Sequence, residues 1–291
     1  MRRLFLALIL LLLSAALVFT EDGGHGNAAN KSKQNDDHNN TAPVQSGYAV
    51  ITPATGATAG LVLFETFGMR GQGDAGTIQA GVLPPDLTVN SVLFVDSSDR
   101  LAKNLGVAIV NPNSFAATVT LTLRKNDGTP VATTTVTVPP RQQIAKFVRN
   151  LFTAPIRIPA ELTGTLAITS NLAVSVIGLR FRGSNFSTLP VTNLSGPAGV
   201  FPFLDTAHTV GGPGALLLPQ FVANGGWATE LVLMNAGTSS LTVRVDLFKS
   251  DGSPLSATLN GQTATQFTGL TIPASGVLTL APRDQDGDDD F

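Results

Sequence analysis

The stretch Leu105–Pro130 (LGVAIVNPNSFAATVTLTLRKNDGTP) occurs twice in the chain. A shift of 124 positions places it without a gap on Thr229–Pro254 (TELVLMNAGTSSLTVRVDLFKSDGSP), where eight of the 26 pairs are identical. These identical pairs are Asn111/Asn235, Thr118/Thr242, Val119/Val243, Leu123/Leu247, Lys125/Lys249, Asp127/Asp251, Gly128/Gly252 and Pro130/Pro254. Since self-similarity at a fixed offset indicates a repeated structural unit, we expect two copies of one module.

The module is predicted to be made of β-strands. In Ala117–Arg124 apolar residues alternate with threonines, which is the period of a strand with one buried face. Asn126-Asp127-Gly128 follows as a hairpin turn, because Gly tolerates positive φ. Further strands are expected at Val92–Val95, Leu105–Val110, Val131–Val138 and Gln143–Val148, with a short helical turn at Phe147–Phe152 and a two-strand hairpin at Gly164–Phe181. Seven short strands in about 100 residues predict an all-β fold of tandem immunoglobulin-like β-sandwich domains.

Composition supports this fold and excludes several classes of function. Only 13% of the residues are charged, against roughly 25% in soluble domains, and the 29 Gly and 18 Pro suit many tight turns. The net charge of -2 gives no basic footprint for nucleic acid. The chain has no cysteine, which excludes disulfides, thiolate metal sites and Cys nucleophiles and fits a bacterial export route.

The N-terminus reads as an export signal. Met1-Arg2-Arg3 precedes the apolar run Leu4–Leu13, and Ser14-Ala15-Ala16 supplies small residues for cleavage, so residues 1–20 are predicted to be a signal peptide. An uncleaved anchor is the alternative, because the apolar run continues to Phe19. No later segment is apolar enough to span a membrane. The polar residues 21–46 are expected to form a disordered linker, and the protein is expected to be secreted or held at the cell surface.

A second internal similarity shows that the order of the repeated parts is permuted along the chain. Residues 47–64 match 164–181 at a shift of 117, with identical pairs Gly47/Gly164, Ile51/Ile168, Thr52/Thr169 and Phe64/Phe181. The predicted order is therefore a β-hairpin (47–84), a complete seven-strand sandwich (88–192), a linker (193–214), a sandwich lacking its last hairpin (215–282) and an acidic tail (283–291).

Three arrangements would complete the last domain. The hairpin at 47–84 folds back onto it within one chain, or completes the last domain of a neighbouring copy by strand exchange, or the chain is part of a longer array. The chain itself is therefore one expected partner, and an extracellular polysaccharide or protein is another.

The module resembles a group of secreted repeat proteins from soil bacteria, especially acidobacterial ones, with immunoglobulin-like modules. The residues that carry the resemblance are Phe221, Gly225-Gly226-Trp227, Thr229, Leu231–Asn235, Leu247-Phe248, Asp251-Gly252-Ser253-Pro254-Leu255, Gly47-Tyr48-Ala49 and Ala80-Gly81-Val82-Leu83-Pro84. The first module departs from it, because Lys103-Asn104-Leu105-Gly106 replaces the Gly-Gly-Trp-x-Thr motif. The resemblance implies the fold and export, and no catalytic residues.

No catalytic motif stands out in the sequence, so we expect a non-enzymatic protein with a structural, adhesive or matrix role. The alternative is a carbohydrate-binding module in which Trp227 stacks on a sugar; a lone Trp also commonly packs against the sandwich. A hydrolase is the third hypothesis, with His208 near Asp205 as the one histidine outside the first 46 residues.

Two interpretations are open for the acidic tail at residues 283–291: a solvated anionic segment, or weak calcium ligation without other cofactors. The candidate ligands are Asp284, Asp286 and Asp288.

Overall fold

The computed structural model describes residues 47–51, 63, 65–70, 77–153, 156–183, 185–194, 204–205, 210–211, 216, 218, 220–223 and 229–282. The chain forms two compact units, Met1–Gly60 and Leu61–Phe291, and all named elements lie in the second. They are β1 (Glu65–Arg70), β2 (Thr77–Val82), β3 (Thr88–Ser98), β4 (Lys103–Asn111), β5 (Ala117–Lys125), β6 (Pro130–Val138), β7 (Gln142–Phe147), α2 (Val148–Leu151), β8 (Glu161–Arg182), β9 (Asn185–Leu189), β10 (Thr192–Asn193), β11 (Leu204–Asp205), β12 (Val210–Gly211), β13 (Leu231–Met234), β14 (Leu241–Asp246), β15 (Ala257–Leu259), β16 (Gln262–Ala264), β17 (Gln266–Ile272) and β18 (Val277–Leu280).

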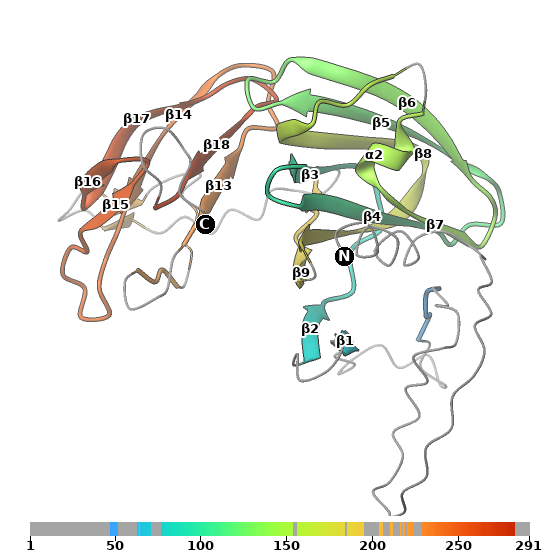
Figure 1. Cartoon of the computed structure of the whole chain (residues 1–291), viewed down its shortest axis with the longest axis horizontal. Helices are drawn as coiled ribbons and strands as arrows, with labels where there is room; N and C mark the ends of the chain where they lie inside the picture. The colour runs from blue at the N-terminus through green and yellow to red at the C-terminus, as the bar shows by residue number, and fades with distance from the viewer. Residues whose placement is uncertain are drawn as a thin grey trace, which may run out of the picture. The chain divides into compact units, whose positions relative to one another are not determined.

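The first repeat, residues 88–194, is one strongly curled antiparallel sheet that forms a half-barrel (Figure 1). Its strand order is β10-β3-β4-β8-β5-β6, with β7 paired to β4 and β9 paired to β8. The all-β prediction is confirmed. Where the strand count predicted an immunoglobulin-like sandwich of two separate sheets, the structure shows a single sheet, because one strand is shared by both halves.

That shared strand is β8, and it corrects the predicted hairpin at Gly164–Phe181. Its first half pairs with β3 and β5, and its second half, from Ser175, pairs with β4 and then β9. The change of partners falls at residues 170–174, which contain no Gly or Pro, and no residue there has a positive φ. Since a tight two-residue hairpin turn needs such residues, the chain continues as one strand and curls the sheet instead.

The core lies on the concave side of this sheet. The apolar half of the alternation in β5 is buried, while its threonines face outward or are half-buried, as the sequence predicts. Side chains from β3 and β8 complete the core, including Leu93, Leu166, Ile168, Val174 and Val176. The predicted helical turn after the fifth strand is confirmed as α2, whose Val148 and Leu151 are buried.

The second repeat, residues 229–282, repeats the pairing of the first. β13 pairs with β18 as β4 pairs with β7, and β14 pairs with β17 as β5 pairs with β6. The equivalent residue pairs are Thr118↔Thr137 with Thr242↔Thr271, and Val110↔Gln143 with Met234↔Val277. The offset is 124 through the hairpin turn to Pro130/Pro254 and 134 at Thr137/Thr271, so ten extra residues follow the turn, where β15 and β16 form.

Within the predicted N-terminal hairpin at residues 47–84, the described strands are β1 and β2, which pair with each other. Residues 47–51 and 63 are outside any strand, and 52–62 and 64 lie outside the described residues. β2 lies against β9, and no described pairing joins β1 or β2 to the second repeat. Completion of the last domain by residues 47–84 stays a prediction.

Within the described residues, no helix has the length and apolar character needed to span a bilayer. The predicted signal peptide, the polar linker at 21–46 and the acidic tail at 283–291 lie outside the described residues. The predicted linker 193–214 is described only in part, and it contains the short antiparallel pair β11–β12.

Candidate functional site

The residues singled out from the sequence for chemistry lie outside the part of the chain that the structure describes. These are Trp227, His208, Asp284, Asp286 and Asp288. Among the described residues, no three His, Asp or Glu side chains are grouped in a way that could hold a metal ion. The polar groups that the structure brings together are instead at the strand ends of each repeat and between the two repeats.

A buried asparagine closes the hairpin framework of each repeat. The Asn111 Nδ2 donates hydrogen bonds to three backbone carbonyls, those of Phe115 (2.8 Å), Val138 (2.9 Å) and Pro139 (3.1 Å). Asn235 donates to the three equivalent carbonyls, those of Ser239 (2.7 Å), Ile272 (3.2 Å) and Pro273 (3.0 Å). Each Oδ1 accepts from the backbone N–H two residues later. One side chain thus satisfies carbonyls where two strands end, which backbone pairing leaves unpaired.

The hairpin turns are also equivalent bond by bond. Asp127 Oδ1 accepts from Thr129 N at 2.8 Å, and Asp251 Oδ1 accepts from Ser253 N at 2.9 Å. The side-chain hydrogen bond from Thr129 or Ser253 is the largest cause that lowers the pKa of each Asp. Gly128 and Gly252 have nearly the same φ, 83° and 82°. These aspartates stabilise turns, because their hydrogen bonds stay within the turn.

The two repeats are joined by backbone contacts. The Val277 N–H donates to the Asn126 carbonyl at 2.8 Å, so the β5–β6 turn of the first repeat extends the start of β18. The Thr165 hydroxyl donates to the Ser275 carbonyl at 3.4 Å. A Cβ on Gly128 would lie 2.0 Å from the Ala274 carbonyl oxygen, so only glycine fits here. We call this contact the junction.

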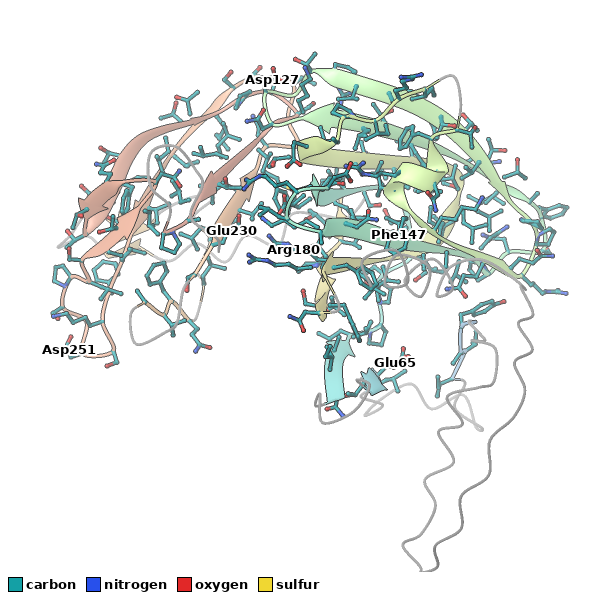
Figure 2. All side chains as sticks on the ribbon, in the orientation of Figure 1. Glu65, Asp127, Phe147, Arg180, Glu230 and Asp251 are labelled. Carbon is teal, nitrogen blue, oxygen red and sulfur yellow. The ribbon has the colours of Figure 1, made fainter. Side chains whose placement is uncertain are left out.

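Four charged side chains make a further contact between the repeats, and we call them the junction cluster: Asp96, Lys103, Arg180 and Glu230. Asp96 Oδ2 is 3.1 Å from Lys103 Nζ and 2.8 Å from Arg180 Nη2. Arg180 Nη1 is 3.1 Å from Glu230 Oε2, and Figure 2 shows these two side chains meeting between the repeats. The Glu230 side chain is only 3% exposed.

The junction cluster is balanced, with two cations and two anions. Buried charges that are matched in this way offset their desolvation through mutual attraction and hydrogen bonds. The cluster therefore has a structural explanation that needs no ligand. In the sequence, Lys103 stands out only as part of the departure from the Gly-Gly-Trp-x-Thr motif. The sequence feature that could have indicated the junction cluster is Lys103 itself, a charged residue next to the apolar run of a strand in a chain with few charges.

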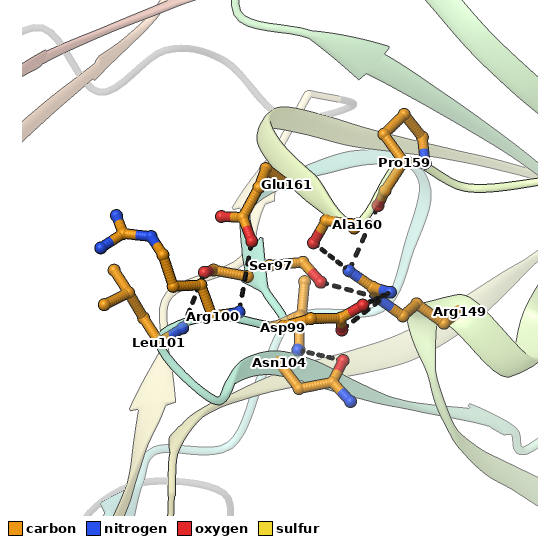
Figure 3. Close-up of polar contacts among 11 residues, drawn as sticks. Ser97, Asp99, Arg100, Leu101, Asn104, Arg149, Pro159, Ala160 and Glu161 are labelled. Atoms are coloured by element: carbon orange, nitrogen blue, oxygen red, sulfur yellow. Dashed lines mark hydrogen bonds and ion pairs between the residues drawn. The ribbon is translucent and has the colours of Figure 1, made fainter.

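A second polar network fixes the connection between α2 and β8 (Figure 3). The Arg149 guanidinium donates to Ser97 Oγ at 2.9 Å, to Asp99 Oδ2 at 3.2 Å and to the backbone carbonyls of Pro159 and Ala160. The Arg100 N–H donates to Glu161 Oε1 at 3.3 Å, and a hydrogen bond from Ser98 is the largest cause that lowers the pKa of Glu161. With its nitrogens directed to loop carbonyls, Arg149 serves to hold the loop.

Comparisons with known proteins give distant structural likeness only. No family model matches the chain, and no curated protein matches it. Two solved structures resemble part of it. One is the Anabaena sensory rhodopsin transducer, 22% identical with a TM-score of 0.28, covering 32% of this chain and 95% of that chain. The other, "Crystal Structure of Thermotoga maritima 1070", is 16% identical with a TM-score of 0.28, covering 37% of this chain and 92% of that chain.

Proposed function

We propose that this chain is an exported, non-enzymatic β protein with a structural or adhesive role at the cell surface or in the surrounding matrix. The observation that carries the proposal is the duplicated framework: two repeats share the same asparagine and aspartate hydrogen bonds and are coupled through a junction. Tandem copies of one module that contact each other are typical of scaffold proteins, in which length is a useful property.

We also propose that the modules are variants of the immunoglobulin-like sandwich, as in the secreted bacterial repeat proteins that the sequence resembles. The equivalent pairing of β4–β7 and β5–β6 with β13–β18 and β14–β17 supports a tandem arrangement. In this proposal the second module is completed by strands from outside residues 229–282, as β3 and β8 complete the first.

Export is tested by fractionation of a bacterial host that expresses the full chain. The proposal predicts that the protein leaves the cytoplasm, is shortened near residue 20 and becomes accessible to protease added to intact cells. A matched variant lacking residues 1–20 is expected to stay in the cytoplasm. Retention of the full chain in the cytoplasm would contradict the proposal.

The role is tested by binding of the purified protein to a panel of insoluble polysaccharides. A structural role predicts no saturable binding that depends on Trp227. If Trp227→Ala abolishes saturable binding to one polysaccharide, while Phe248→Ala does not, the carbohydrate-binding alternative is correct instead.

A further inference from the structure

The junction joins a turn of the first repeat to a loop of the second, and each side has a glycine where the two backbones meet. The turn is residues 125–130, between β5 and β6, and the loop is residues 273–276, which lead into β18. A Cβ on Gly128 would lie 2.0 Å from a backbone oxygen of the loop, and a Cβ on Gly276 would lie 2.6 Å from a backbone oxygen of the turn. Because only glycine lets backbones approach this closely, the contact requires glycine on both sides.

The second repeat has a turn of the same build, at residues 249–254. The Lys249 N–H donates to the Ser253 carbonyl at 2.8 Å, where the equivalent bond of the first repeat measures 2.9 Å. Residues 249–252 are exposed, and a Cβ on Gly252 would meet nothing within 4 Å among the described residues. The second repeat therefore repeats the turn half of the junction, and no described loop lies against its glycine.

The first repeat lacks the glycine on the loop half. By the pairing of the last strand of each repeat, residues 139–142 are the counterpart of 273–276. Gln142 stands at the position of Gly276. Its Cβ would take the place that lies 2.6 Å from the carbonyl oxygen of a docked turn, and backbone atoms cannot move aside as a flexible side chain can. The first repeat of one copy therefore cannot receive the turn 249–254 of another copy in the geometry of the junction.

We propose that the turn 249–254 is a docking surface for another β module of this type, one with glycine at the position of Gly276, and that Gln142 keeps a second copy of this chain off it. The contact between a turn and a loop is heterologous, so a chain with both halves available would grow into open filaments. Gln142 prevents this growth while the turn keeps its docking half. The docking is independent of export, so failure of either proposal leaves the other standing.

The test gives the first repeat the loop of the second. A loop variant with Pro140→Ala, Arg141→Ser and Gln142→Gly has at 139–142 the sequence of 273–276. Its molar mass by light scattering should rise with concentration from one chain to two or more, because each copy then has both halves. The matched control has the same first two changes with Gln142→Ala, which keeps a Cβ at this position. The control and the parent should each stay at one chain.

A further substitution in the loop variant checks that its association uses the turn. Gly252→Ala should return the molar mass to one chain, because the added Cβ would meet the docked loop. Gly269→Ala is the control: Gly269 also has a positive φ and open space, but it lies on β17, so association should persist. Urea unfolding confirms that each variant is folded, and Gln142→Gly alone replaces the loop variant if that one does not fold.

Two results would overturn the proposal. A folded loop variant that remains a single chain at all concentrations, or that associates equally well with Gly252→Ala, would show that the turn 249–254 is not a docking surface. A parent chain that already associates, and that loses this association with Gly252→Ala, would show that Gln142 does not block the contact.

Discussion

The first and second repeats share one framework and differ in how their cores are closed. Both have the same strand pairing, the same buried asparagine and the same hydrogen-bonded turn. In the first repeat β3 and β8 cover the apolar face, whereas β14 of the second repeat keeps Leu241 48% exposed. The comparison shows that the hairpin framework is encoded locally, while the core depends on strands supplied from elsewhere in sequence.

The largest difference in unfolding free energy between the two repeats is expected when equivalent core side chains, Leu121 and Val245, are shortened to alanine. Leu121→Ala should reduce the free energy of unfolding by about 2–5 kcal/mol, because it opens a cavity in a fully buried site. Val245→Ala should cost about 1 kcal/mol or less, because its side chain packs against the second core but is only partly buried. Equilibrium urea unfolding measures both. Equal losses would mean that the second core is as closed as the first.

Substitution of the two equivalent asparagines is expected to give a smaller difference in the free energy of unfolding. Asn111→Ala leaves three carbonyls without their side-chain donor, and each buried unsatisfied group costs about 1–3 kcal/mol. Asn235→Ala removes the three equivalent bonds at a residue that is 7% exposed, against 0% for Asn111, so a smaller loss is expected. Urea unfolding of the two variants side by side checks this order. A larger loss for Asn235→Ala would reverse the comparison.

Alanine substitution of the two turn glycines distinguishes the cost of a positive φ from the cost of a steric overlap at the junction. At both Gly128 and Gly252 alanine should cost about 1–2 kcal/mol, because L-residues disfavour positive φ. Only at Gly128 would the new Cβ also overlap a neighbour, the Ala274 carbonyl, whereas Gly252 has open space. Thermal unfolding should therefore show a larger loss for Gly128→Ala. Identical losses would argue against the junction.

The turn aspartates should behave alike in the two repeats. Their pKa values in the folded protein are lowered, so their stabilisation is complete above the unfolded value of about 3.9 and is lost as the pH falls through the lower folded value. Asp127→Asn and Asp251→Asn should each weaken the acid dependence of stability, by a similar and small amount. Unfolding midpoints recorded across acidic pH measure it. Unchanged acid sensitivity in both variants would contradict the role given to these turns.

Local patterns predicted the framework well. The Val/Leu–Thr alternation gave β5 with its buried face, Asn126-Asp127-Gly128 gave the turn, and the offset of 124 gave the repeat. The single strand β8 was missed, because residues 164–181 show the same period whether they turn back or continue. The choice is made by β3, β4 and β5, which are distant in sequence.

The junction cluster could not be predicted either. Lys103 and Glu230 are isolated charges in apolar surroundings, and nothing local in the sequence shows that Arg180 and Asp96 link them. Asn111 and Asn235 are visible in the sequence as an identical pair. The three carbonyl acceptors of Asn111, however, depend on where β6 ends. Long-range polar contacts of this kind follow from topology, which local periodicity does not specify.

Among the described strands, none pairs with β14 on the edge where β8 pairs with β5 in the first repeat. Residue-resolved hydrogen exchange on dilute, single-copy protein tests it most directly, because an amide that points to an open edge exchanges without unfolding of the sheet. The account predicts protection along the whole of Ala117–Lys125, and rapid exchange at alternate amides of Leu241–Asp246. Uniform protection of Leu241–Asp246 in the single chain would contradict it, since a strand would then already lie on that edge.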